Sequence, residues 1–162
     1  MSSSKATAFD QDFYAWTQEQ AAALRRAAAD RVNLPIDWEN LAEEVDSMGR
    51  GERHEIEHRL TVLLTHLLKW FCCPDLRDRC ERPWRLIIRE QRRMIVKRLA
   101  DSPSLRPFAA AAFAEAYRNA RGDAADEAEA DIRSFPPDPP FSLDEALDPA
   151  YPPDLFPPEW RG

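Results

Sequence analysis

One long run of apolar positions with helical spacing dominates the chain. It extends from Trp38 to Phe71, and its last third, LTVLLTHLLKWF, is apolar on nearly every side. A helix with this pattern must be surrounded by other helices, because none of its faces suits water. The pattern predicts a soluble, all-α protein with a four-helix-bundle-like fold, built around one long central helix.

Shorter amphipathic stretches predict the other helices of the bundle. We expect a first helix over residues 12–30 with Asp10 as its cap, and a third over residues 83–100, with Pro83 in its first turn. A fourth helix, capped by Ser104, should end near Ile132. These helices and the central one form a predicted bundle domain over residues 9–134, which follows a loose tail at residues 1–8.

The first half of the central helix carries a mixed signal. Asp37 is the expected cap, and Leu41, Val45 and Met48 form the stripe expected to be buried. Two glycines then interrupt the stripe at positions 49 and 51. Each glycine costs about 1 kcal/mol against alanine in a helix interior. We therefore expect either a bend there or two helices in line.

The last part of the chain, residues 135–162, has a different composition. It holds most of the 14 prolines, yet it also carries large apolar residues such as Phe141 and Phe156. Ser142 and Glu145 have the spacing of a capping box, which predicts one short helix. The segment is expected to be a strap packed on the bundle, and the alternative is a disordered proline-rich recognition tail.

Composition limits the classes of protein to consider. A chain of 162 residues suits one domain, and its net charge of -7 opposes non-specific binding to nucleic acid or anionic membranes. Cys72, Cys73 and Cys80 are an odd, clustered set of the kind expected for free thiols. The start of the chain has no apolar signal segment, and the longest apolar stretch is too short to span a bilayer. We expect a cytoplasmic protein with no membrane partner.

One string matches a metal-binding motif. His54, Glu55 and His58 form HEIEH, in which two histidines on one helix face could share Zn²⁺ while the glutamate serves as general base. The surrounding charges are typical of a solvated helix face, and a third ligand would have to be a carboxylate such as Glu44 or Glu90. No metal or other cofactor is therefore expected, and a zinc-dependent hydrolase remains an alternative.

His66 is a second candidate, because it lies in the middle of the apolar run LLTHLLKW. A buried imidazole needs hydrogen-bond partners. Glu44 on the same helix, with Glu90 and Gln91 on the third helix, could form a buried polar cluster around it. The cluster is typical of a satisfied core histidine, and the alternative is a catalytic role.

The third helix is strongly basic, with nine Arg or Lys and three acids from Arg77 to Arg98. Such a face is compatible with nucleic-acid binding. However, residues 37–49 and residues 123–131 each carry five acids and no base. Pairing of opposite charges across the bundle or across a dimer is the preferred explanation, and nucleic acid is not an expected partner.

Three stretches together resemble the bacterial domain-of-unknown-function 29 family. They are ENLAEEVDSMGRGERHEIEHRLTVLLTHLLKW, RPWRLIIREQRRMIVKRLADSPSLR and FSLDEALDPAYPPDLFP, and the opening FDQDFYAWTQEQAAALR is similar to the family's N-terminus. The resemblance implies a helical, four-helix-bundle-like fold and no established activity. The histidines of HEIEH do not belong to the family pattern. The positions that match recurring polar residues of the family are Glu43, Glu44, Gly49, His66, Trp70, Trp84, Glu90 and Gln91.

Taken together, these features predict a small interaction or structural module with no established catalytic activity. Its protein partner is unknown, and a homodimer is one option. The expected contact surfaces are the proline-rich strap and the aromatic residues at the start of the first helix, namely Phe9, Phe13, Tyr14 and Trp16.

Overall fold

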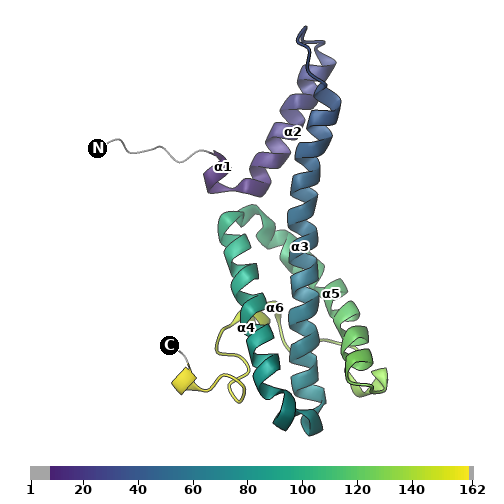
Figure 1. Cartoon of the computed structure of the whole chain (residues 1–162), viewed down its shortest axis with the longest axis vertical. Helices are drawn as coiled ribbons and strands as arrows, with labels where there is room; N and C mark the ends of the chain where they lie inside the picture. Colours follow the sequence, from purple (N-terminus) through teal and green to yellow (C-terminus); the bar gives the residue numbers. More distant parts are fainter. Residues whose placement is uncertain (1–7, 161–162) are drawn as a thin grey trace, which may run out of the picture. The chain divides into compact units, whose positions relative to one another are not determined.

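The computed structural model describes residues 8–160, and every regular element in that range is helical (Figure 1). The prediction of an all-α protein is therefore confirmed. The tail expected at residues 1–8 lies almost wholly outside the described residues. No helix in the described range is both long and apolar enough to cross a membrane. The α-helices are α1 Ala8–Gln11, α2 Phe13–Ala29, α3 Trp38–Cys72, α4 Arg77–Asp101, α5 Arg106–Glu127 and α6 Leu143–Leu147; the short 3₁₀ turns are η1 Pro74–Leu76, η2 Pro103–Leu105, η3 Ile132–Ser134 and η4 Pro158–Trp160.

The chain divides into two compact units. Unit 1 comprises the chain up to Glu55 together with Arg98–Phe108, and unit 2 comprises Ile56–Lys97 together with the chain from Ala109 onward. The division falls inside three helices, so α3, α4 and α5 each contribute residues to both units. The sequence predicted one bundle over residues 9–134, whereas α2 and the last part of α3 belong to different units.

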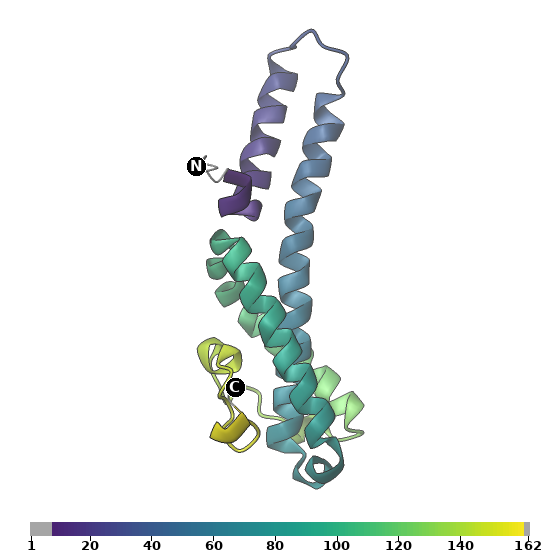
Figure 2. The same ribbon diagram turned by 60° about the vertical axis from the view of Figure 1, so that its left-hand side comes forward.

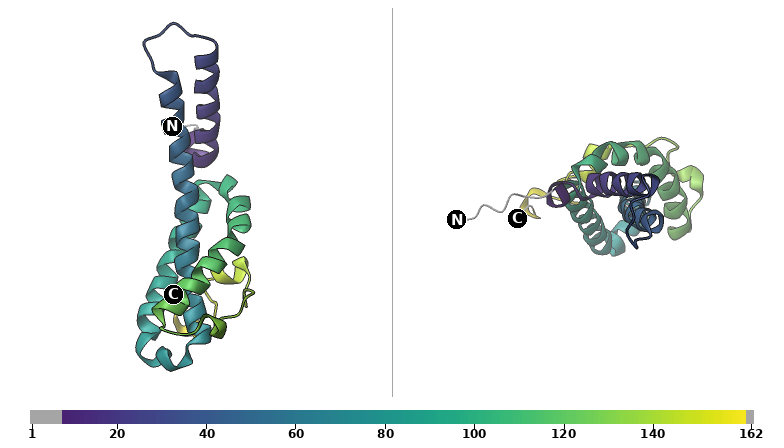
Figure 3. Two further views of the ribbon diagram at one scale, coloured as in Figure 1. Left: turned by 90° about the vertical axis from the view of Figure 1, so that its right-hand side faces the viewer. Right: turned by 90° about the horizontal axis from the view of Figure 1, so that it is seen from above.

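Unit 1 is built on a helical hairpin, in which α2 and the first part of α3 run antiparallel (Figure 3). Small side chains line the contact between them: Thr17 and Ala21 on α2, with Ala42 and Gly49 on α3, are buried. A Cβ atom at Gly49 would lie only 2.5 Å from Thr17 Oγ1, so the two backbones approach closely there. The hairpin is therefore held by close backbone approach rather than by large apolar side chains.

This seam overturns the predicted buried stripe of the central helix. Leu41 is 43% exposed and Met48 is 49% exposed, because the face that meets α2 carries Ala42 and Gly49 instead. The expectation of two helices in line is also wrong, since α3 is one uninterrupted helix from Trp38 to Cys72. Gly49 serves as the point of close contact, and it does not break the helix.

Two of the predicted helix caps do not form. The cap of α2 is Asp12, which accepts from the backbone N–H three residues on at 2.8 Å, and Asp10 lies within α1. Ser104 does not cap α5. Its backbone N–H and its hydroxyl donate to the Asp12 carboxylate at 2.7 and 2.8 Å, which joins η2 to the start of α2 within unit 1. The cap predicted at Asp37 forms, since its Oδ1 accepts from Asn40 N at 3.2 Å.

Unit 2 surrounds the apolar end of α3. The leucines at positions 60, 63, 64, 67 and 68 are all inaccessible to solvent, as the pattern on nearly every side of the helix predicted. Residues of three other segments cover them. The buried apolar residues of these segments include Ile88 and Ile95 on α4, Ala116, Ala120 and Ala124 on α5, and Phe135, Phe141 and Leu155 in the strap.

Two helix boundaries differ from the prediction. The third long helix, α4, begins at Arg77, and Pro83 lies inside it rather than in its first turn. Proline at an interior position removes one backbone hydrogen bond and usually kinks or breaks a helix, but α4 continues through Pro83. The next helix, α5, ends at Glu127, and the region near Ile132 forms only a 3₁₀ turn.

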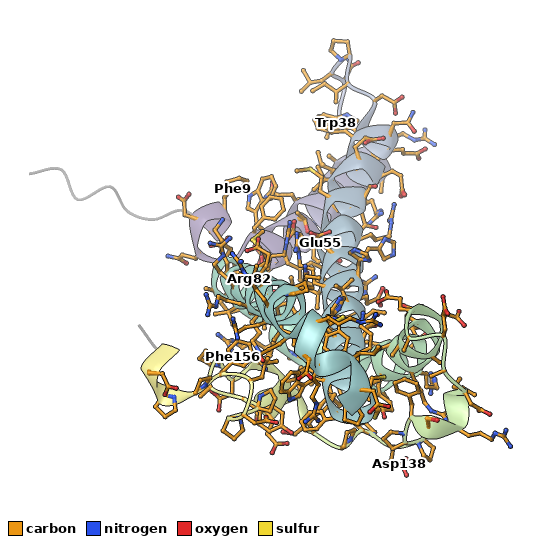
Figure 4. The ribbon with its side chains drawn as sticks, turned by 60° about the horizontal axis from the view of Figure 1, so that its bottom comes forward. Phe9, Trp38, Glu55, Arg82, Asp138 and Phe156 are labelled. Carbon is orange, nitrogen blue, oxygen red and sulfur yellow. The ribbon has the colours of Figure 1, made fainter. Side chains whose placement is uncertain are left out.

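The proline-rich strap packs on the helices of unit 2. Its short helix, α6, begins at the predicted capping box, in which Ser142 Oγ accepts from Glu145 N and the Glu145 side chain accepts from Ser142 N. Phe135, Phe141 and Phe156 are buried. Figure 2 shows the strap beside α4, and Figure 4 places Phe156 there. In the described part of residues 135–162, these aromatic side chains are therefore buried within unit 2.

Candidate functional site

The HEIEH string lies on the surface of α3. The side chains of His54 and His58 are exposed, and Glu55 Oε1 forms an ion pair with Arg98 Nη2 at 3.7 Å. Across residues 8–160, no three His, Cys, Asp or Glu side chains gather in a way that could hold a metal ion. The third ligand that a zinc site requires is therefore not found beside this pair.

The polar cluster predicted around His66 does not form. His66 is buried, but its Nδ1 donates to the Val62 carbonyl one turn earlier at 2.8 Å. Glu90 is exposed and forms an ion pair with Arg93 on its own helix. Gln91 Oε1 accepts from Arg59 Nη1 at 3.1 Å. Glu44 is exposed in unit 1. A carbonyl on its own helix satisfies the imidazole, so no acid from another helix is needed.

A different polar group lies next to His66. Lys69, one turn further along α3, is almost fully buried and forms an ion pair with Glu127 of α5. Its Nζ also lies 5.5 Å from the centroid of the Trp84 ring on α4. Burial lowers the pKa of His66; the Lys69 charge lowers it further, and the Glu127 charge opposes this. Sequence reasoning missed this group, although a lysine inside an apolar run signals a need for a buried partner.

The acidic residues in the first part of α3 form ion pairs mainly within the hairpin, and fewer of their ion pairs involve the basic helix α4. Asp46 Oδ2 on α3 accepts from Arg25 Nη2 of α2 and from Arg50 Nη1 of its own helix, each at 3.1 Å. Glu43 joins the same network through Arg50. On α4, Arg98 Nη1 donates to Glu52 at 2.7 Å. The acids at 43 and 46 therefore pair with α2 and with α3 itself, and not with α4 as the sequence suggested.

The indole of Trp70 anchors the strap to the helices. Its Nε1 donates to the Asp154 carboxylate, at 3.2 Å from each oxygen. Arg77 covers the same ring, with its Cζ 4.5 Å from the centroid, and its Nε donates to the Trp70 carbonyl at 2.8 Å. The end of α3, the start of α4 and the strap are thereby joined at one point.

The second strap contact of this kind contains a buried arginine that sequence reasoning missed. Arg92 is 4% exposed, and its Nε donates to the Ala146 carbonyl at 2.7 Å. Its Cζ lies 5.0 Å from the centroid of the Phe156 ring, and neither Nη1 nor Nη2 has a hydrogen-bond partner. Burial lowers the pKa of Arg92 to about 10, and the charge of Asp148 opposes this. The sequence signal that could have revealed this burial is the position of Arg92 between Ile88 and Ile95, which are both buried.

The three cysteines are free thiols, as predicted. Cys73 is buried, whereas Cys72 and Cys80 are half-buried. Burial raises the pKa of the Cys72 and Cys73 thiols above the ordinary value. A raised pKa makes both thiols poor nucleophiles near neutral pH.

The hairpin of unit 1 exposes a row of apolar side chains. This hairpin patch lies in the loop between α2 and α3 and on the following turns of α3, and each of its members is between 41% and 55% exposed. Its members are Val32, Leu34, Ile36, Leu41 and Met48. A separate aromatic group at the start of the hairpin joins Phe9 to Phe13 and Trp16, with ring centroids 5.3 and 5.0 Å away.

Comparison with known proteins identifies the family and the fold. The family model described as "Domain of unknown function DUF29" matches residues 8–152, which confirms the resemblance drawn from the sequence. A solved α-helical protein of unknown function from Rhodospirillum rubrum is similar in structure, with a TM-score of 0.71 and 22% sequence identity. The similarity covers 94% of this chain and 96% of that one, and at this identity it shows the fold alone. No curated protein matches the sequence.

Proposed function

The chain belongs to the DUF29 family of domains of unknown function, and we propose that it is an interaction module that pairs with a second copy of itself. The contact surface is the hairpin patch of unit 1. The observation that carries this proposal is the exposure of five large apolar side chains between residues 32 and 48. Such patches on soluble proteins commonly mark contact sites.

The patch has the arrangement of a helix-packing surface. Leu41 and Met48 are seven residues apart, so they lie two turns apart on one face of α3. Their face is distinct from the one that meets α2 through Ala42 and Gly49. The hairpin seam consists of small side chains, so the hairpin itself buries few large apolar groups. A second pair of helices laid on this face would complete a four-helix arrangement.

Charge complementarity favours a second copy as the occupant. Arg25, Glu43 and Asp46 already form ion pairs within the hairpin. Arg26 of α2 and Arg31 just beyond its end are exposed, and so are Glu39 and Glu44 of the α3 arm. A two-fold axis places the same patch on both copies, so that the α2 arm of each can lie against the α3 arm of the other. Apolar side chains then meet apolar side chains, and basic side chains meet acidic ones.

Sedimentation equilibrium of the full chain tests the proposal. We expect a reversible dimer that becomes monomeric in the double variant Leu41→Glu/Met48→Glu. The matched control is Leu86→Glu/Val96→Glu, which places the same charges on half-exposed apolar positions of α4 and should remain dimeric. Circular dichroism establishes that both variants are folded. A wild-type chain that stays monomeric at high concentration, or two variants with equal dimer affinity, would contradict the proposal.

A further inference from the structure

Arg92 of unit 2 combines burial with incomplete hydrogen bonding. Its side chain is among the buried charged groups, yet Nη1 and Nη2 have no partner. A buried charge without hydrogen-bond partners is costly, so such groups in native proteins are usually met by a protein group, an ordered water, an ion or a ligand. The position therefore differs from those of Lys69 and Arg85, two other buried cations of this unit, which pair with Glu127 and Glu81.

The contacts of the guanidinium leave one of its edges without a hydrogen-bond partner. Its Nε is committed to the carbonyl of Ala146, near the C-terminal end of α6, where backbone carbonyls lack partners within the helix. The Phe156 ring lies 5.0 Å from Cζ. The remaining edge presents Nη1 and Nη2 side by side, which is the geometry that binds two oxygens of one carboxylate or phosphate group.

Two groups of the strap act on Arg92 through their charge, but the structure shows neither in a hydrogen bond to Nη1 or Nη2. Asp148 contributes a charge that raises the pKa of Arg92, but its Oδ1 accepts from Ala150 N at 2.8 Å in the turn after α6. Tyr151 also acts on Arg92 through its charge, and its ring packs against Phe71 with centroids 6.0 Å apart. Both nitrogens of the edge are buried, and an ion pair is screened less there than at the surface.

From this geometry we propose that the Nη1–Nη2 edge of Arg92 binds a small oxyanion, with a carboxylate or phosphate group, beneath the strap. The proposal does not depend on pairing of the chain through unit 1. Because the edge is buried, entry of the ligand requires the strap to move away from α4. Binding should therefore stabilise the docked strap as well as the guanidinium.

Thermal denaturation with sodium acetate or sodium phosphate, at ionic strength held constant with sodium chloride, tests the proposal. We expect the Tm of the wild-type chain to rise saturably with one or both oxyanions, as linkage requires for a ligand of the native state. Arg92→Gln should abolish the rise. The matched control is Arg89→Gln, an exposed arginine on the same helix, which should respond as the wild type does. The acetate and phosphate arms distinguish a carboxylate ligand from a phosphate ligand.

A second measurement covers the case in which Arg92→Gln fails to fold. Titration of the wild-type chain with the same anions, followed by the arginine Nε–H signals in ¹⁵N NMR, should shift the Arg92 signal saturably. No saturable response in either experiment would overturn the proposal, because water or protein oxygens must then meet the two nitrogens. The proposal would also be overturned if the anions raised the Tm or shifted the NMR signal only in Asp148→Asn, since Asp148 would then be the natural partner of Arg92.

Discussion

Replacement of Gly49 by alanine should destabilise unit 1, although alanine is the better helix former. The added Cβ would lie 2.5 Å from Thr17 Oγ1 and 2.7 Å from Gln18 Nε2. Gln18 is exposed, so its amide can swing away, but Thr17 is fully buried and its hydroxyl donates to the Tyr14 carbonyl at 2.7 Å. The α2 and α3 backbones must therefore separate, or Thr17 must give up this hydrogen bond.

The magnitude follows from two opposed effects. Alanine gains about 1 kcal/mol over glycine in a helix interior. Overpacking of a close contact costs about 1–3 kcal/mol. The net expectation is a loss of about 1 kcal/mol in the free energy of unfolding. Urea denaturation followed by far-UV circular dichroism measures this change, and hydrogen exchange of the α2 amides locates it.

Gly51 provides the matched control, because it lies two residues away on the same helix and a Cβ there meets nothing within 4 Å. Gly51→Ala should raise the free energy of unfolding by about 0.5–1 kcal/mol. Thr17→Ala in the Gly49→Ala background removes the hydroxyl that clashes, so the double variant should recover stability. If Gly49→Ala proves as stable as Gly51→Ala, the close-contact explanation of the seam is refuted.

Three further predictions concern unit 2. In urea denaturation, Glu127→Ala should lower the free energy of unfolding by about 2–3 kcal/mol, and Lys69→Met should lower it by less than about 1 kcal/mol. The two differ because the Lys69 side chain is 7% exposed and that of Glu127 is 50% exposed, so only Glu127→Ala leaves a buried charge unpaired. Since burial lowers the pKa of His66, the folded state favours the neutral imidazole, and stability is lost as the pH falls below the unfolded value of about 6.5. The wild-type Tm should thus fall more steeply than that of His66→Asn between about pH 7 and pH 5, and parallel curves would contradict this. Ser142→Ala removes the cap of α6 and should cost about 1 kcal/mol, seen as faster hydrogen exchange in α6 alone.

Features that depend on local sequence could be predicted. The enclosed leucines near Leu63 follow from a pattern that has no polar face, and the α6 cap follows from two residues three positions apart. The hairpin seam could not be predicted by looking for large apolar residues. In this seam the small residues mark the buried face: Ala42 and Gly49, seven residues apart, are buried. The large apolar residues Leu41 and Met48 are exposed.

The candidate site was predicted less well, because its partners are far apart in the sequence. Lys69 and Glu127 are separated by 58 residues, and Arg92 and Ala146 by 54. Many acids and carbonyls could have met each of these cations, and hydropathy does not select among them. His66 shows the converse error: the sequence suggested distant side chains as its partners, namely Glu44, Glu90 and Gln91, whereas the Val62 carbonyl one turn away accepts its hydrogen bond.

The course of the polypeptide through its two units restricts how the protein can be divided. Each passage from one unit to the other lies within a helix, at α3, α4 and α5. No single cleavage of the backbone can release either unit whole, because unit 1 is formed by two stretches with part of unit 2 between them. A single continuous segment of the gene therefore encodes neither unit whole.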